Sequence, residues 1–267
     1  MQKNESPIGI FDSGIGGLTV YRALKEILPG ERFVYLGDTA RLPYGTKSPG
    51  TIIRFSLENA EFLLQFDIKA LVVACNTSSS VAIEDLKKKY PHLVILGVIE
   101  PSARRALEVS RGGKIGVIGT EATIRSGKYQ KILRQGGAEV YAKACPLFVP
   151  LVEEGWIYHP VTRMVAEEYL RGWRDKIDTL ILGCTHYPVI KKAISEAVGD
   201  DKVLVESGEA VGLELREILR ERNLLRETPS REEDLFFVTD FLEKFERVSS
   251  LFLGRKVKIE ERKFSLC

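Results

Sequence analysis

Two stretches of the chain, ALVVACNTSSS at residues 70–80 and TLILGCTHYP at residues 179–188, share one pattern. In each, a short apolar run ends at a cysteine, Cys75 or Cys184, and residues with hydroxyl groups follow. A continuous apolar run of this length is typical of a strand that is buried on both faces, as in a parallel sheet. Both stretches therefore predict a buried strand whose carboxyl end carries a cysteine.

The rest of the chain alternates similar apolar runs with amphipathic segments, which is the pattern of βα units. The expected strands lie at residues 8–11, 32–36, 70–74 and 93–98 in the first half and at 114–118, 138–144, 179–182 and 202–205 in the second. Helical segments are expected at residues 17–28, 51–66, 81–90 and 209–222. The sequence therefore predicts an α/β fold with mostly parallel sheets.

The two halves share a register. Adding 108 or 109 to a position moves Asp12, at the end of the first expected strand, to Thr120, and moves Cys75 to Cys184. Internal similarity of this kind indicates a repeated structural unit. We therefore expect two similar parallel-sheet α/β domains related by pseudo-two-fold symmetry, with the active site in the cleft between them.

The domain boundaries follow from this register. We expect residues 1–98 together with 208–267 to form the first domain, and residues 99–207 to form the second. A further strand-like run at residues 235–239 has no counterpart in the repeat. We expect this tail to pack on the first domain.

Composition and charge exclude several classes of protein. The 39 Lys and Arg residues nearly balance the 37 Asp and Glu residues, so we expect neither nucleic acid nor a membrane surface as a partner. The longest apolar run, residues 93–99, is far shorter than the roughly 20 residues of a membrane span, and the first residues are polar, so no secretion signal is expected. The four cysteines form no C-x-x-C pair, so we expect no metal site and reduced thiols in the cytoplasm.

A glycine-rich turn, DSGIGG at residues 12–17, joins the first expected strand to the next helix. Such a turn can present backbone N–H groups to an anion. A dinucleotide fingerprint would require a third glycine at position 19, where the chain has Thr19. Two readings stay open: a tight turn that simply needs glycine, and an anion-binding turn that uses Asp12 and Ser13.

The two matched cysteines lie at the sheet edge where α/β proteins bind ligands, each expected just ahead of a helix. Helix N-termini there favour a thiolate and a bound carboxylate. A lone free cysteine is more often an inert core residue, but a matched pair followed by hydroxyl, amide and imidazole groups indicates a ligand site. We expect His186 to tune Cys184, and Cys145 and Cys267 to be incidental.

Together these residues resemble the motifs of bacterial glutamate racemase, within the aspartate/glutamate racemase superfamily. The resemblance extends from about residue 8 to about residue 219, and it is carried by DSGIGG (12–17), PYG (43–45), ACNT (74–77) and GCTHYP (183–188). It implies an isomerase that needs no cofactor, interconverts L- and D-glutamate and supplies D-glutamate for peptidoglycan. It also implies a homodimer.

The resemblance further implies roles for individual residues. Cys75 and Cys184 would be the two acid/base thiols, assisted by Asp12, Glu153 and His186. The implied substrate-binding residues are Asp12, Ser13, Tyr44, Gly45, Asn76, Thr77, Thr185 and His186, with Thr120 and Thr123 as further carboxylate contacts.

The chemistry agrees with the repeat. Racemisation removes a proton from one face of the α-carbon and delivers another to the opposite face, so two similar groups on facing domains suit it. Aspartate racemase or a related isomerase of the superfamily stays open as an alternative, as does a non-catalytic protein that clamps an acidic ligand. A cysteine hydrolase is disfavoured, because a second thiol in a mirror position has no role in it.

Overall fold

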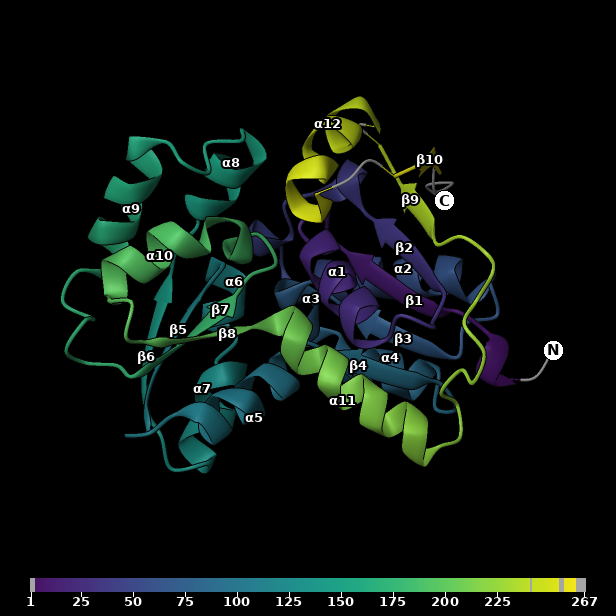
Figure 1. Cartoon of the computed structure of the whole chain (residues 1–267), viewed down its shortest axis with the longest axis horizontal. Coiled ribbons are helices and arrows are strands. Elements are labelled where there is room, and N and C mark those ends of the chain that lie inside the picture. Colours follow the sequence, from purple (N-terminus) through teal and green to yellow (C-terminus); the bar gives the residue numbers. More distant parts are fainter. Residues whose placement is uncertain (1–2, 241, 255–256, 263–267) are drawn as a thin grey trace.

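The computed structural model describes residues 3–240, 242–254 and 257–262, which form two α/β lobes side by side (Figure 1). The strands of the first lobe are β1 (Ile8–Asp12), β2 (Phe33–Gly37), β3 (Ala70–Val73), β4 (Val94–Gly97), β9 (Leu235–Val238) and β10 (Glu260–Glu261). Those of the second are β5 (Lys114–Gly119), β6 (Glu139–Ala144), β7 (Thr179–Gly183) and β8 (Val203–Glu206). Each strand expected from the sequence is present to within one residue at either end.

The two sheets confirm the predicted repeat. All neighbouring strands run parallel, and the order β2-β1-β3-β4 in the first sheet recurs as β6-β5-β7-β8 in the second. Every residue of β1, β2, β3 and β7 is buried, as expected for strands covered by helices on both faces. The chain therefore folds as two like parallel-sheet domains.

Helices cover the faces of both sheets (Figure 1). In the first lobe they are α1 (Leu18–Ile27), α2 (Pro49–Leu64), α3 (Asn76–Val81), α4 (Ile83–Lys89) and α12 (Leu242–Leu253). In the second they are α5 (Ile99–Val109), α6 (Glu121–Arg125), α7 (Lys128–Gln135), α8 (Phe148–Glu153), α9 (Pro160–Leu170) and α10 (Lys191–Val198). Within the described ranges, no helix combines the length and apolar character that a membrane crossing requires.

One helix begins earlier than the sequence predicts. The expected helix at 81–90 is two helices, because α3 begins directly after Cys75 and a break at Ala82 separates it from α4. The serine-rich sequence of α3 has low intrinsic helix propensity and is typical of a loop. The helix forms because tertiary bonds hold it: Ser79 Oγ donates to the carbonyl of Val73 at 2.8 Å and accepts from the Val98 N–H at 3.1 Å.

The C-terminal tail extends the first sheet. Strand β9 pairs with β2, and β10 pairs with β9. Helix α11 (Ser207–Glu221) contacts α1 of the first lobe and α5 of the second, and α12 contacts α1. With the proposed boundaries, the chain crosses between lobes before α5 and again at the start of α11. Cys267 lies outside the described residues.

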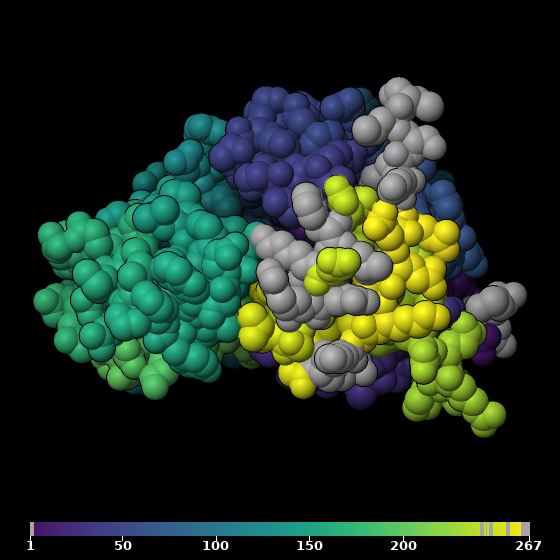
Figure 2. Space-filling model, turned by 90° about the horizontal axis from the view of Figure 1, so that it is seen from above, coloured from purple at the N-terminus to yellow at the C-terminus, as the bar shows by residue number. Residues whose placement is uncertain are grey.

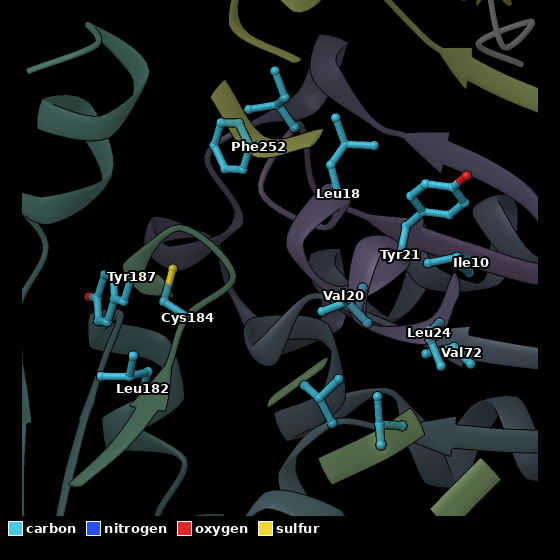
Figure 3. Packing of buried hydrophobic residues seen from close by; sticks show 14 of the residues in the cluster. Ile10, Leu18, Val20, Tyr21, Leu24, Val72, Leu182, Cys184, Tyr187 and Phe252 are labelled. Atoms are coloured by element: carbon cyan, nitrogen blue, oxygen red, sulfur yellow. The ribbon is translucent and has the colours of Figure 1, made fainter. Parts of the chain in front are cut away.

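The two lobes share one hydrophobic core. The main apolar cluster contains buried residues of both sheets, together with Phe252 from α12. Figure 3 shows Leu182, Cys184 and Tyr187 on the second lobe and Leu18, Val20 and Phe252 on the first. Seen from above, the yellow C-terminal segment lies beside the teal second lobe (Figure 2). This shared core holds the carboxyl edges of the two sheets against each other.

Candidate active site

The predicted site residues meet where these two edges face each other. Cys75 lies two residues after the end of β3, and Cys184 directly follows the equivalent strand β7; their exposed fractions are only 5% and 6%. Asp12, the last residue of β1, lies close to the second lobe, because the Thr185 hydroxyl donates to its Oδ1 at 3.4 Å. The site predicted between the two domains is therefore formed by buried residues of both lobes.

Glycine is required in the 12–17 turn because the second lobe packs directly on it. A Cβ atom at Gly16 would lie 2.3 Å from Thr185 Oγ1 and 2.5 Å from His186 Nδ1. At Gly17 it would lie 2.4 Å from Asp12 Cβ. Close approach between the lobes therefore accounts for Gly16, and close packing within the first lobe accounts for Gly17.

Asp12 is a fully buried carboxylate at the centre of the contact. Its Oδ2 accepts a 3.0 Å hydrogen bond from the Gly14 N–H. Burial raises the pKa of Asp12, and the nearby charge of His186 is the largest of the effects that oppose this rise. Asp12 therefore lies within electrostatic reach of the histidine on the other lobe.

The Cys75 thiol is held in its protonated form. Its Sγ lies 3.6 Å from Ser13 Oγ. Burial and the charge of Asp12 raise the pKa of Cys75 to about 11, although hydrogen bonds with Ser78 and Ser13 offset part of the rise. The Ser78 N–H in the first turn of α3 lowers this pKa, which is the direction expected of a helix N-terminus, but burial and Asp12 outweigh it.

Cys184 has a different environment. His186 Nδ1 lies 3.8 Å from the Cys184 sulfur, and His186 Nε2 lies 3.3 Å from Glu153 Oε1. Burial alone lowers the pKa of His186, but its contacts with Cys184 and Glu153 outweigh burial and raise the pKa to about 10. An imidazolium thus lies beside this thiol at neutral pH, and Glu153, rather than its exposed neighbour Glu154, is the carboxylate that holds it.

The expected α-helix directly after Cys184 is absent from this segment. The chain instead passes through a turn and a short 3₁₀ helix, η4 (Tyr187–Ile190), before α10 begins. Pro188 stands at the start of η4, where its missing N–H is tolerated. For Cys184 the neighbouring His186, rather than a helix N-terminus, is therefore the source of positive charge.

Three threonine hydroxyls from both lobes form a cluster near Cys75. Thr77 Oγ1 on α3 lies 3.0 Å from Thr120 Oγ1 and 3.5 Å from Thr123 Oγ1. Thr120 also caps α6, since its side chain accepts from the Thr123 N–H. Hydroxyl groups can rotate to donate to a carboxylate, so this cluster is suited to the anion that the sequence motifs indicate.

The hydroxyl of Tyr44 is already bound by other side chains of the first lobe. It begins the short helix η3 (Tyr44–Thr46), and its hydroxyl is bound to the Asp38 carboxylate and receives a 3.2 Å hydrogen bond from Asn59 Nδ2. Its ring packs in the same small cluster as Cys75. Gly45 lies against Thr120, where an added Cβ would be 3.0 Å from the threonine Cβ. Any substrate contact of Tyr44 in this geometry therefore falls to the backbone.

Sequence reasoning missed three residues of this region, namely Tyr129, Ser207 and Phe252. Asn76 Nδ2 donates to Tyr129 OH at 2.9 Å and to Ser207 Oγ at 3.3 Å. Phe252, from α12, packs edge-on against the His186 ring at a centroid distance of 5.9 Å. Tyr129 reads as an ordinary apolar position of an amphipathic helix, and Phe252 lies outside the repeat, so neither carries a local signal.

Cys145 is buried away from these partners. Burial raises the pKa of its thiol to about 12. Its backbone carbonyl accepts a 2.9 Å hydrogen bond from the Tyr187 hydroxyl. These contacts are those of a core residue.

Comparisons with known proteins agree with the motifs. The sequence profile of the family described as Asp/Glu/Hydantoin racemase matches residues 8–213. A glutamate racemase of Geobacter metallireducens is 51% identical over 253 residues, covering 94% of this chain and 93% of that protein.

Two solved structures are similar over nearly their whole length. The glutamate racemase isoform RacE1 of Bacillus anthracis superposes with a TM-score of 0.92 at 37% identity, covering 98% of both chains. The glutamate racemase of Francisella tularensis, solved in complex with D-glutamate, superposes with a TM-score of 0.89 at 40% identity, again covering 98% of both chains.

Proposed function

The chain belongs to the Asp/Glu/Hydantoin racemase family, and from that premise we propose that it racemises glutamate with Cys75 and Cys184 as its two acid/base groups. The observation that carries the proposal is the matched position of the two thiols. Each follows the equivalent strand of one sheet, β3 or β7, and the two sheet edges face each other. The enzyme is an isomerase that supplies D-glutamate for peptidoglycan.

The two thiols have unequal environments. This difference supports a starting state in which Cys75 is the proton donor and Cys184 is the proton acceptor. Cys75 keeps its proton, because burial and Asp12 raise its pKa. The Cys184 sulfur lies 3.8 Å from Nδ1 of the His186 imidazolium, so positive charge lies beside this thiol and not beside Cys75. In one direction Cys184 accepts the α-proton of glutamate while Cys75 donates its own proton to the opposite face. After one turnover the two cysteines have exchanged protonation states, and the reverse reaction restores them.

Auxiliary roles follow from the same contacts. His186 and Glu153 assist Cys184, since they form a chain of contacts from its sulfur. Asp12 assists Cys75, whose pKa it influences. Negative charge that develops on the substrate carboxylate during proton removal is stabilised by hydroxyl and N–H donors already in place. The residues assigned to substrate binding are Asp12, Ser13, Asn76, Thr77, Thr120, Thr123, Thr185, His186 and the backbone at Tyr44 and Gly45.

We also propose that the enzyme acts in the cytoplasm as a homodimer. Large apolar side chains are exposed on the segment that includes α8 and the start of α9: Leu147, Trp156, Tyr158, Val161 and Met164. Clustered exposed apolar surface is common at protein interfaces. Light scattering of the purified protein tests the proposal, and a monomer mass at micromolar concentration would contradict it.

Racemisation is tested by incubating the protein with L-glutamate in deuterated water without added pyridoxal phosphate. We expect loss of optical rotation together with deuterium uptake at the α-carbon, and the same final mixture from D-glutamate. Parallel incubation with L-aspartate tests the alternative substrate. Unchanged optical rotation of glutamate after long incubation would refute the proposed function.

A further inference from the structure

The side-chain amide of Asn76 is buried and has a defined set of partners. Asn76 is 2% exposed and directly follows Cys75. Both hydrogens of its Nδ2 are used, one by Tyr129 OH at 2.9 Å and one by Ser207 Oγ at 3.3 Å. Among the described residues, its Oδ1 has no hydrogen-bond partner although it is buried. A buried acceptor without a donor is costly, so this oxygen points to a ligand.

The hydrogen bonds around this amide have a fixed direction. Ser102 Oγ donates to the Val98 carbonyl at 2.6 Å, and Ser207 Oγ donates to the Leu182 carbonyl at 3.5 Å. A carbonyl only accepts, so each serine has spent its single proton and is left as an acceptor. Ser102 and Ser207 both lie within hydrogen-bonding reach of Tyr129, and the phenol proton therefore goes to one of these two acceptors. The Tyr129 oxygen is then an acceptor, and only the NH₂ group of Asn76 can face it.

The lobes differ in what they contribute to this arrangement. Asn76 begins α3 of the first lobe, whereas Tyr129 lies on α7 and Ser102 on α5 of the second. Tyr129 and Ser102 are completely buried. Water therefore does not compete for these bonds, and two buried hydroxyls, those of Tyr129 and Ser207, set the orientation of the amide.

From this network we propose that Tyr129 is a positioning residue, which fixes the Asn76 amide with Oδ1 free to accept a hydrogen bond from the α-ammonium group of the substrate. The proposal rests on the proposed function. Glutamate carries one donor group, its ammonium, and two carboxylates that only accept. The ammonium is bonded to the α-carbon, which Cys75 must reach, so an acceptor on the next residue is well placed for it.

The test compares ligands with and without the ammonium. In Tyr129→Phe the Asn76 amide loses the nearer of its two acceptors, and only Ser207 still holds it. We expect KM for both glutamate enantiomers to rise about 10-fold to 100-fold, the range for one hydrogen bond to a charged group. Glutarate, which has both carboxylates and no ammonium, should inhibit the variant and the wild type with equal Ki. Ser207→Ala removes the second acceptor of the Asn76 NH₂ group, so KM should rise in the same way.

Tyr21→Phe is the matched control. Tyr21 is 1% exposed, and its hydroxyl donates to Asp234 at 2.8 Å, remote from the cysteines. It should lower the melting temperature as much as Tyr129→Phe while leaving KM and the glutarate Ki unchanged.

Three results would overturn the inference: equal KM in Tyr129→Phe and Tyr21→Phe, an unchanged KM in Ser207→Ala, or a parallel loss of glutarate and glutamate binding. Failure of the wild type to racemise glutamate would refute the proposed function instead, so the two failures are distinguishable.

Discussion

Replacing Glu153 by Gln should lower the pKa of His186 and change the pH dependence of the reaction. The carboxylate lies 3.3 Å from His186 Nε2, and the side chains are 16% and 7% exposed, so solvent screens this ion pair poorly. In the variant a neutral amide replaces the charge with little change in shape. We therefore expect His186 to titrate closer to neutral pH than in the wild type.

The size of the effect follows from the pKa. A rise from 6.5 to about 10 corresponds to a net interaction of about 5 kcal/mol, at about 1.4 kcal/mol per pKa unit. Cys184 and Glu153 share this interaction, so removing one of them should lower the pKa of His186 by one to two units, or about 2 kcal/mol. Because the folded-state pKa is the higher one, this stabilisation is complete below pH 6.5 and is lost as pH rises toward 10.

The assay is an NMR titration of the imidazole signals, which is tractable because the chain has three histidines. Glu154→Gln is the matched control, since Glu154 is the exposed neighbour on the same turn. In Glu153→Gln the values of kcat/KM for L-glutamate and for D-glutamate must fall by the same factor, because the two enantiomers have equal free energy. The individual values of kcat and KM can change separately in the two directions. An unaltered His186 titration in Glu153→Gln would show that the ion pair does not control the imidazolium.

Three further outcomes are expected. Cys75→Ser and Cys184→Ser should each reduce racemisation by at least about 100-fold in both directions, the usual contribution of one acid/base group, with glutamate binding retained in calorimetry; a fully active single variant would exclude the two-thiol mechanism. Gly16→Ala should lower kcat/KM and the melting temperature, because its methyl group would lie 2.3 Å from a hydroxyl of the second lobe, whereas Gly50→Ala, with nothing within 4 Å, should match the wild type in both assays. Lys69→Met should reduce the urea-measured free energy of unfolding by about 3–5 kcal/mol, because it leaves a buried carboxylate unpaired; a cost below about 1 kcal/mol would mean that the pair contributes little.

The sequence predicts the sheets and the thiol pair because their signals are local. A buried parallel strand is a short apolar run, and a cysteine at its end is visible without tertiary information. The paired positions of Cys75 and Cys184 also follow from the repeat. The two halves have the same order of strands even where their side chains differ. The family resemblance adds Glu153, which the structure brings to His186.

What the sequence does not predict depends on contacts between distant segments. Helix α3 forms in a run of serines because Ser79 binds two neighbouring strands. The hydroxyl of Tyr44 is bound by Asp38, a preference that no local pattern reveals. Tyr129 looks like a core aromatic, and its role depends on which serine protons are already engaged by carbonyls.

The burial of both thiols has a kinetic consequence. With Cys75 and Cys184 only 5% and 6% exposed, we expect glutamate to reach the sulfurs only when the lobes move apart. The measured affinity is then the intrinsic affinity reduced by the fraction of molecules that are open. Substitutions that tighten the contact between the lobes would make opening, rather than proton transfer, the slow step.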